Sequence, residues 1–290
     1  MTLATQSARK SHHLKLGRIL QQIVLYILIS GGAFLCLFPF YWMIVVATRP
    51  SSEVFSFPPP IIPGHLLIQN VQSLLASIPY GQNFLNSVLY ATSVTLLMLF
   101  FDSLAGFAFA KYEFPGRDAL FTFLLATMMI PYTVTLIPWF IEMKWFGWIN
   151  SYAALIVPSA VDAFGIFWMR QYIAGAVSSE LIDAARIDGC GDFGIYRRIV
   201  LYIASPALAA LGILTFLGAW NNLVGPLIIM AEPSRFTLTV ALRTLVGLRL
   251  TDYGALMAGT VGSVIPILVI YLAGARRFIA GIAAGSLQGV

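Results

Sequence analysis

Charged side chains are scarce in this sequence. Aspartate, glutamate, lysine and arginine make up 10% of its 290 residues, whereas about 25% is usual for soluble globular domains. Hydrophobic residues reach 59%, and the mean hydropathy is +0.85. This composition excludes an ordinary soluble domain and predicts an integral membrane protein.

Histidine, cysteine and phosphate-binding motifs are also rare or missing. The three histidines, His12, His13 and His65, lie outside the long apolar runs, so an intramembrane serine protease would lack its base and a metal hydrolase its ligands. The two cysteines, Cys36 and Cys190, supply no disulfide framework. No lysine follows a glycine, so the chain has no P-loop. We therefore expect no enzyme activity, metal or cofactor on this chain, and any ATP must bind another subunit.

Six runs with few or no charges predict an all-α membrane protein with six transmembrane helices. Each run exceeds the roughly 20 residues that a helix needs to cross the hydrocarbon. The strands of a β-barrel would instead alternate over about ten residues. The first run is also too long for the apolar core of a signal peptide, which has about 7–15 residues. The runs are residues 19–48, about 84–110, 119–141, 145–169, 199–231 and 253–275.

Lysine and arginine are distributed unequally between the two sets of loops. Twelve of the 17 fall on one side, and cytoplasmic loops carry such an excess. Both termini are therefore expected in the cytoplasm, as tails 1–18 and 276–290 around a transmembrane domain 19–275. Residues 170–198 form the one sizeable cytoplasmic loop. The same asymmetry explains the pI near 9.3, so no nucleic-acid partner is expected.

The loop 170–198 contains a polar, helix-forming segment at residues 180–189. Ala184 and Ala185 would let another surface approach closely, and Gly189 would stop the helix. The helical spacing predicts one small-to-apolar face with an acid at its end. That face comprises Leu181, Ala184, Ala185 and Asp188.

An amphipathic helix lying on lipid is the alternative interpretation of this segment. Lipid-binding helices favour lysine and arginine opposite bulky apolar residues. Here Glu180, Asp183 and Asp188 would be repelled by anionic headgroups. The composition therefore favours docking to a protein.

This loop resembles that of the inner-membrane permease subunits of ABC importers. Their pattern is Glu-Ala-Ala, three residues, Gly, nine residues and then Ile-x-Leu-Pro. The chain departs from it twice, because Asp183 replaces the glutamate and Tyr202 stands where proline is usual. The matching residues are Asp183, Ala184, Ala185, Gly189, Ile199 and Leu201.

Further segments look like the MalG-type permease of carbohydrate importers and extend the resemblance over almost the whole chain. Two positions differ from that type: Ser178 replaces a proline and Gln288 replaces a lysine. The similar segments are residues 39–42 (Pro-Phe-Tyr-Trp), 114–117 (Phe-Pro-Gly-Arg), 128–131 (Met-Met-Ile-Pro), 167–171 (Phe-Trp-Met-Arg-Gln), 219–222 (Ala-Trp-Asn-Asn) and 281–285 (Gly-Ile-Ala-Ala-Gly) with Gly289.

The resemblance implies a type I ABC importer permease in the inner cell membrane. Its implied partners are a second homologous permease, two ATP-binding subunits that carry ATP and Mg, an extracytoplasmic solute-binding protein and a sugar. Loops 49–83 and 232–252 would receive the binding protein. The segment 180–189 would be the coupling helix that fits a groove of the ATPase subunit, through Glu180, Asp183, Ala184, Ala185, Arg186, Asp188 and Gly189.

Two acids, Asp102 and Asp162, lie within the apolar runs. They stand nine and eight residues from Lys111 and Arg170, which predicts similar depths at about 1.5 Å per residue. A carboxylate at such depth is expensive and usually faces a cavity or a partner. Asp162 is expected either to bind sugar hydroxyls or to serve as a capped or protonated structural acid. Proton coupling through both acids, in a secondary transporter, is the alternative function, although the inverted repeats usual there are not seen.

The sequence Trp220-Asn221-Asn222 is polar and aromatic within the fifth run. An indole can cover the C–H face of a sugar, and amides can bind its hydroxyls. The same residues also join membrane helices through hydrogen bonds between helices. Both interpretations stay open from the sequence.

Overall fold

The computed structural model describes residues 2–247 and 251–286, with the side chains of residues 20–247 and 251–274. Gln288, which replaces a lysine of the MalG-type pattern, and Gly289 lie outside these described residues. All regular elements in the described range are helical. The chain divides into two compact units, which are Met1–Gln72 with Asp252–Val261 and Ser73–Thr251 with Gly262–Val290.

The first unit contains α1 (Thr2–Ala47) and the short helix η1 (Ser51–Glu53). Leu20–Ala47 is long and apolar enough to span a membrane, close to the predicted run 19–48. Asn70 fastens the end of α1, because its amide donates hydrogen bonds of 2.9 Å to the carbonyls of Ala47 and Arg49. Asn70 lies on α2 (Leu67–Ser77).

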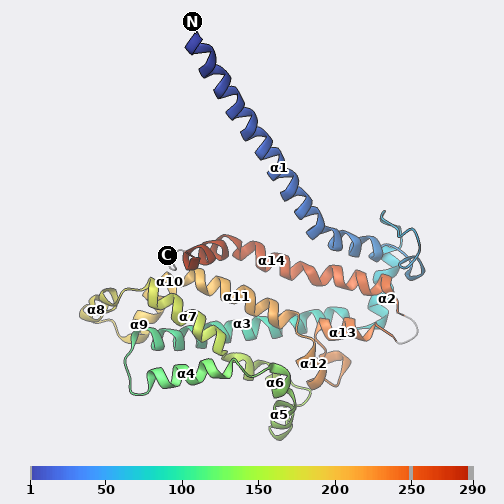
Figure 1. The fold of residues 1–290 in the computed structure, drawn as a ribbon. Coiled ribbons are helices and arrows are strands. Elements are labelled where there is room, and N and C mark those ends of the chain that lie inside the picture. Colours follow the sequence, from blue (N-terminus) through green and yellow to red (C-terminus); the bar gives the residue numbers. More distant parts are fainter. Residues whose placement is uncertain (1, 248–250, 287–290) are drawn as a thin grey trace. The chain divides into compact units, whose positions relative to one another are not determined.

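The second unit is built on α3 (Tyr80–Lys111), α7 (Ala163–Ala176) and α11 (Ser205–Trp220), which pack side by side (Figure 1). Their apolar faces and the following loop share one core. Its fully buried members include Met169, Ile173, Val200, Ala207 and Leu211.

The third predicted span is broken. Residues 119–141 were expected to form one continuous helix, but α4 (Arg117–Thr127) and α5 (Tyr132–Trp145) meet at 98°. Pro131 precedes α5 in an extended conformation. Proline has no N–H and disfavours helical geometry in the residue before it, which accounts for the break.

The fourth predicted span is displaced towards the C-terminus. It was expected over 145–169, whereas the membrane-length segment is Ala153–Ala176. It contains α6 (Ala153–Ile156), the short helix η2 (Pro158–Ala160) and α7. Arg170 therefore lies inside α7, and the loop begins at Val177 instead of residue 170. The guanidinium of Arg170 is accommodated 4.1 Å above the ring centroid of Phe121, where its charge is attracted by the ring.

The fifth predicted span is also interrupted. Its helices are α11 and α12 (Val224–Ile229), and residues 221–223 separate them. The Trp-Asn-Asn sequence is thus at a helix end and not within a continuous helix. Among described residues, five helices can span a membrane, or six if the bent pair counts as one. The remaining elements are α8 (Ser179–Ile187), α9 (Asp192–Ile195), the π-helical η3 (Tyr196–Val200), α10 (Leu201–Ile203), η4 (Pro233–Arg235), α13 (Leu238–Thr244) and α14 (Tyr253–Ser286).

Candidate functional site

Helix α8 has well-defined ends. The hydroxyl of Ser178 accepts a 3.3 Å hydrogen bond from the N–H of Leu181, as an N-cap does. At the other end Gly189 has φ +79°, and its N–H donates to the carbonyl of Arg186 while that of Cys190 donates to Ala185. This pair of bonds is a Schellman motif. The predicted helix stop at Gly189 is confirmed.

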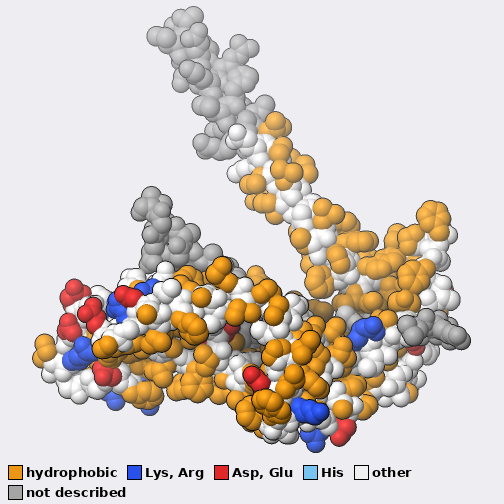
Figure 2. Space-filling view, turned by 60° about the horizontal axis from the view of Figure 1, so that its bottom comes forward, with side chains coloured by type: hydrophobic (Ala, Val, Ile, Leu, Met, Phe, Trp, Pro, Cys, Tyr) orange, Lys and Arg blue, Asp and Glu red, His pale blue; other side chains and the backbone are white. Residues whose placement is uncertain are grey.

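The exposed face of α8 differs in one residue from the face that the spacing predicted. Leu181 and Ala184 are exposed, as is Ile187 at 87%. Ala185 is only 8% exposed and packs with Ile182 in the core of the chain itself. Its predicted place on an outer docking face is therefore wrong, because the buried side of the helix passes through Ile182 and Ala185. Figure 2 shows acidic and basic side chains gathered at the end of the unit where α8 lies.

Charges around α8 interact mainly with one another. Arg186 lies 3.5 Å from carboxylate oxygens of Asp183 and of Asp192, with its guanidinium 5.5 Å from the ring centroid of Tyr112. Arg186 therefore braces α8 against two neighbouring segments of this chain. The pKa of Glu180 is lowered, because its carboxylate accepts hydrogen bonds from its own backbone N–H and from Ser178.

Tyr196 joins the loop to α3, a contact that no sequence pattern predicted. Its side chain is 2% exposed, and its hydroxyl lies 2.8 Å from that of Ser103 on α3. Its ring stacks on Phe107 with centroids 6.0 Å apart. Burial raises the pKa of Tyr196. Because Ile182 and Ala185 belong to the same core, α8 and α3 are connected through packed side chains.

A cavity of about 380 Å³ with a mostly apolar wall lies where three helices are interrupted. Tyr132 begins α5, Asp162 precedes α7, and Asn222 lies between α11 and α12. An adjoining cavity of about 290 Å³ shares part of this lining. The residues common to both cavities are Tyr90, Met98, Ser159, Asp162 and Asn222.

The two acids of the apolar runs are close together, as their predicted depths suggested. Asp102 is fully buried, and its Oδ1 accepts a 3.0 Å hydrogen bond from the backbone N–H of Asp162. Oδ2 of Asp102 has no hydrogen-bond partner among the described residues. The Asp162 carboxylate accepts from the N–H of Gly165 at 3.1 Å and caps α7. Only Asp162 of the pair lines the cavity.

The Trp-Asn-Asn residues point in different directions. Trp220 is 3% exposed, and its indole N–H donates to the carbonyl of Ser263 at 3.2 Å. Asn221 donates back to the carbonyl of Leu217 in its own helix. Asn222 alone lines the cavity, where its amide donates to the Tyr90 hydroxyl at 3.1 Å and accepts from the N–H of Gly225 at 3.3 Å.

Sequence reasoning missed most of the cavity lining. Tyr132 and Ser159 each follow a proline inside an apolar run, and a proline that breaks a helix exposes the residues beside it. That signal was present at both positions. Trp139 also follows a proline, Pro138, although that proline lies inside α5 without ending it, whereas the lining residues Tyr90 and Thr135 have no such signal.

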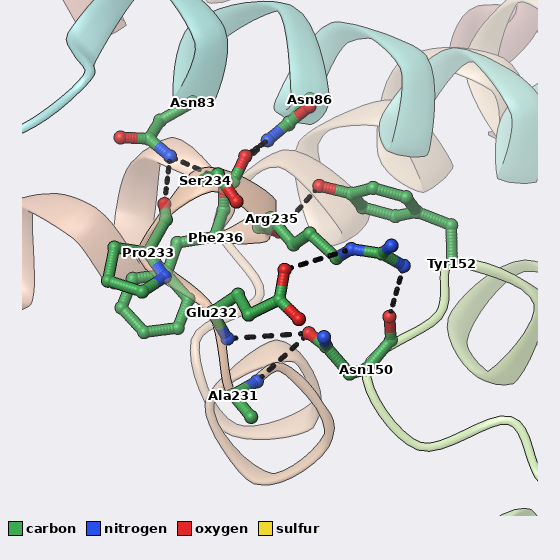
Figure 3. A network of polar contacts seen from close by, with 10 residues as sticks. All are labelled: Asn83, Asn86, Asn150, Tyr152, Ala231, Glu232, Pro233, Ser234, Arg235 and Phe236. Carbon is green, nitrogen blue, oxygen red and sulfur yellow. Dashed lines mark hydrogen bonds and ion pairs between the residues drawn. The ribbon is translucent and has the colours of Figure 1, made fainter.

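A second polar network fixes the turn between α12 and α13 (Figure 3). The amides of Asn83 and Asn86 donate to carbonyls of the turn at 2.9–3.1 Å. Asn150, with φ 60°, accepts from the N–H groups of Ala231 and Glu232. Arg235 binds the carbonyl of Asn150, and the Tyr152 hydroxyl binds that of Arg235, both at 2.7 Å. The turn is therefore held by hydrogen bonds with α3 and with the segment that precedes α6.

Within the described part of the chain, no three His, Cys, Asp or Glu residues gather as they would around a metal ion.

Known proteins with similar sequences and folds are transport permeases. The family described as "binding-protein-dependent transport system inner membrane component" matches residues 102–278. The AraQ arabinooligosaccharides transport permease of Halalkalibacterium halodurans is 36% identical over 89% of this chain and 93% of its own length. The LacG lactose transport permease of Rhizobium radiobacter is 33% identical over 92% of this chain and 96% of its own length.

One solved structure has the same fold, with a TM-score of 0.79 at 22% identity, covering 90% of this chain and 98% of the other. It is a bacterial ABC transporter involved in the import of the acidic polysaccharide alginate. Nothing in these similarities supports a proton-coupled secondary transporter. The family match covers more than half of the sequence, and both relatives align along nearly their full length. The chain belongs to the family of inner-membrane components of binding-protein-dependent transport systems.

Proposed function

We propose that this chain is one of two permease subunits in an ATP-driven importer of carbohydrates. The carbohydrate class is supported by the two relatives, which are permeases for arabinooligosaccharides and for lactose. A homologous permease would complete the translocation pathway. ATP and Mg would bind to two further subunits, and an extracytoplasmic binding protein would deliver the sugar.

The observation that carries the coupling role is the exposed apolar stripe of α8. Leu181 and Ala184 are exposed beside Ile187, which is 87% exposed, on a short helix with fixed ends. An apolar patch of this kind, rimmed by charges, is typical of a protein–protein contact. The ATPase subunit would cover it. Through Ile182, Ala185 and Tyr196 a displacement of α8 would reach α3.

The cavity between the helix interruptions is the proposed stretch of the sugar pathway on this chain. Asp162 and Asn222 supply polar groups there, and Trp139 supplies an aromatic face. Trp220 and Asn221 have a supporting role, since their polar groups bind backbone carbonyls. Asp102 would act indirectly, because its carboxylate binds the backbone of the segment before α7 and does not line the cavity.

On the opposite face of the membrane, the loops 49–83 and 232–252 would receive the binding protein. The cytoplasmic location of both termini, inferred from the distribution of lysine and arginine, is part of this proposal. In that orientation the turn held by Asn83, Asn86 and Asn150 lies outside the cell membrane.

Purification of the tagged chain from its native cells in mild detergent tests the proposal. Recovery of a second permease and an ATPase, followed by sugar uptake into liposomes that depends on ATP, is the expected result. Uptake by this chain alone, driven by a proton gradient without ATP, would instead establish the secondary transporter and refute the proposal.

A further inference from the structure

The cavity at the helix interruptions carries charge of one sign only. Asp162 lies on its wall in both adjoining parts. Neither lysine nor arginine is among the described lining residues. The other polar side chains of the lining are uncharged: they carry hydroxyls, an amide and an indole, on Tyr90, Tyr132, Thr135, Trp139, Ser159, Thr215 and Asn222.

Asp162 lies at the N-terminus of α7 and caps this helix. Its carboxylate accepts the N–H of Gly165 in the first turn of α7, a 14-residue helix. The partial positive charge of a helix N-terminus stabilises a carboxylate at this position. The same interaction takes the N–H of Gly165, so this donor is not available to an anionic ligand.

Hydrogen-bond chemistry points in the same direction as the charge. A carboxylate only accepts hydrogen bonds, so Asp162 needs a ligand group that donates. The Tyr90 hydroxyl accepts from Asn222 at 3.1 Å, which leaves its own hydrogen to donate. A sugar hydroxyl can satisfy both partners, because it donates and accepts. The carboxylate group of a uronate, or the phosphate group of a phosphate ester, offers Asp162 no donor and adds a like charge.

We infer that this cavity is selective for uncharged glycosyl groups and discriminates against acidic sugars. This inference rests on the proposed function and names the substrate class of the same site. In this selectivity the chain would differ from the alginate importer, which has the same fold but is involved in the import of an acidic polysaccharide. Asp162 is the specificity-determining residue, and its amide counterpart would keep the helix cap while removing the charge.

Protection of an engineered cysteine tests the selectivity without the binding protein, which has its own preference. Ser159→Cys would be introduced into the assembled permease–ATPase complex after Cys36 and Cys190 are replaced by serine. The rate of maleimide labelling would be measured at increasing concentrations of galactobiose or of digalacturonate, which differ only at their C6 groups. The same series of concentrations would be measured with the Asp162→Asn variant.

We expect galactobiose to protect at a concentration at least about tenfold lower than digalacturonate, since juxtaposed like charges oppose binding. Asp162→Asn should bring the two concentrations to within about threefold, because only the charge is lost. Equal protection in the unmodified site, better protection by digalacturonate or an unchanged ratio in Asp162→Asn would overturn the inference.

The proposed function can fail separately. If neither sugar protected a complex that still imported a neutral sugar with ATP, the inference about this cavity would be wrong and carbohydrate import would stand. If the complex imported no carbohydrate at all, neutral or acidic, the proposed function would be refuted together with the inference.

Discussion

The carboxylate of Asp102 accepts a 3.0 Å hydrogen bond from the backbone N–H of Asp162, 60 residues further along the chain. A fully buried side chain on α3 thereby holds the extended segment from which α7 starts. The carboxylate that lines the cavity and the carboxylate that anchors it belong to two different acids. Several consequences of this arrangement can be measured.

Replacement of the anchor should weaken both the fold and transport. Asp102→Leu leaves the part-buried N–H of Asp162 without its acceptor, which should cost up to about 1–3 kcal/mol and lower the Tm of the complex in detergent. Asp102→Asn keeps a carbonyl oxygen and should retain most of both properties. The control is Asp118→Ala, because the Asp118 side chain is 82% exposed. Unchanged Tm and uptake in Asp102→Leu would contradict the anchoring role.

Close packing of α7 on α3 depends on Gly165. A Cβ at this position would collide with the Asp102 carboxylate. Gly165→Ala should therefore lower the Tm, although alanine favours a helix intrinsically by about 1 kcal/mol. Gly81→Ala on α3 is the matched control, since a Cβ there has no neighbour within 4 Å. If Gly165→Ala were as stable as the control, the close approach would be absent in solution.

Two adjacent alanines on α8 should respond differently to the same substitution. Ala184 is exposed and Ala185 is 8% exposed. Ala184→Glu should change the free energy of unfolding of the isolated chain by no more than about 0.5 kcal/mol, as is usual at the surface, leave its Tm nearly unchanged and abolish co-elution with the ATPase. Ala185→Glu should lower the Tm itself, because it buries a charge without a partner. Normal co-elution of Ala184→Glu would exclude the exposed stripe as the docking face.

The end of α8 offers a second matched pair. Gly189 has φ +79°, a conformation that costs other residues about 1–2 kcal/mol, whereas Gly191 has φ −69°. Gly189→Ala should loosen the end of the helix and reduce the ATP hydrolysis that accompanies transport. Gly191→Ala should be close to neutral in the same assay. Equal effects of the two substitutions would show that the left-handed conformation has no role in coupling.

Composition was sufficient to predict a helical membrane protein and the limits of its first and last spans. The first and last spans, Leu20–Ala47 and Tyr253–Gly274, differ by one residue at most from the predicted runs 19–48 and 253–275. The predicted end of the fourth span was wrong because Arg170 was taken as the first residue of the loop. Its guanidinium is instead accommodated inside α7, over the ring of Phe121.

The candidate sites were predictable only in part, for a related reason. Hydropathy measures the length of an apolar run and is insensitive to a bend within it, so the breaks at Pro131 and before Asp162 were not foreseen. The cavity is formed by those breaks. The position of α8 and its glycine stop followed from local signals, but the burial of Ala185 depends on residues distant in sequence, such as Tyr196.

The 98° bend between α4 and α5 divides this pair of helices into two halves with different attachments. Phe121 on α4 lies beneath the Arg170 guanidinium of α7, so that half belongs with the helix that leads into the α8 loop. Tyr132, Thr135 and Trp139 on α5 form part of the cavity wall. If the proposed ATPase subunit displaced α8, we would expect the displacement to reach this bend through α7 and α4, so that α5 and the cavity wall would change their angle to α4 without a movement of the whole pair through the lipid.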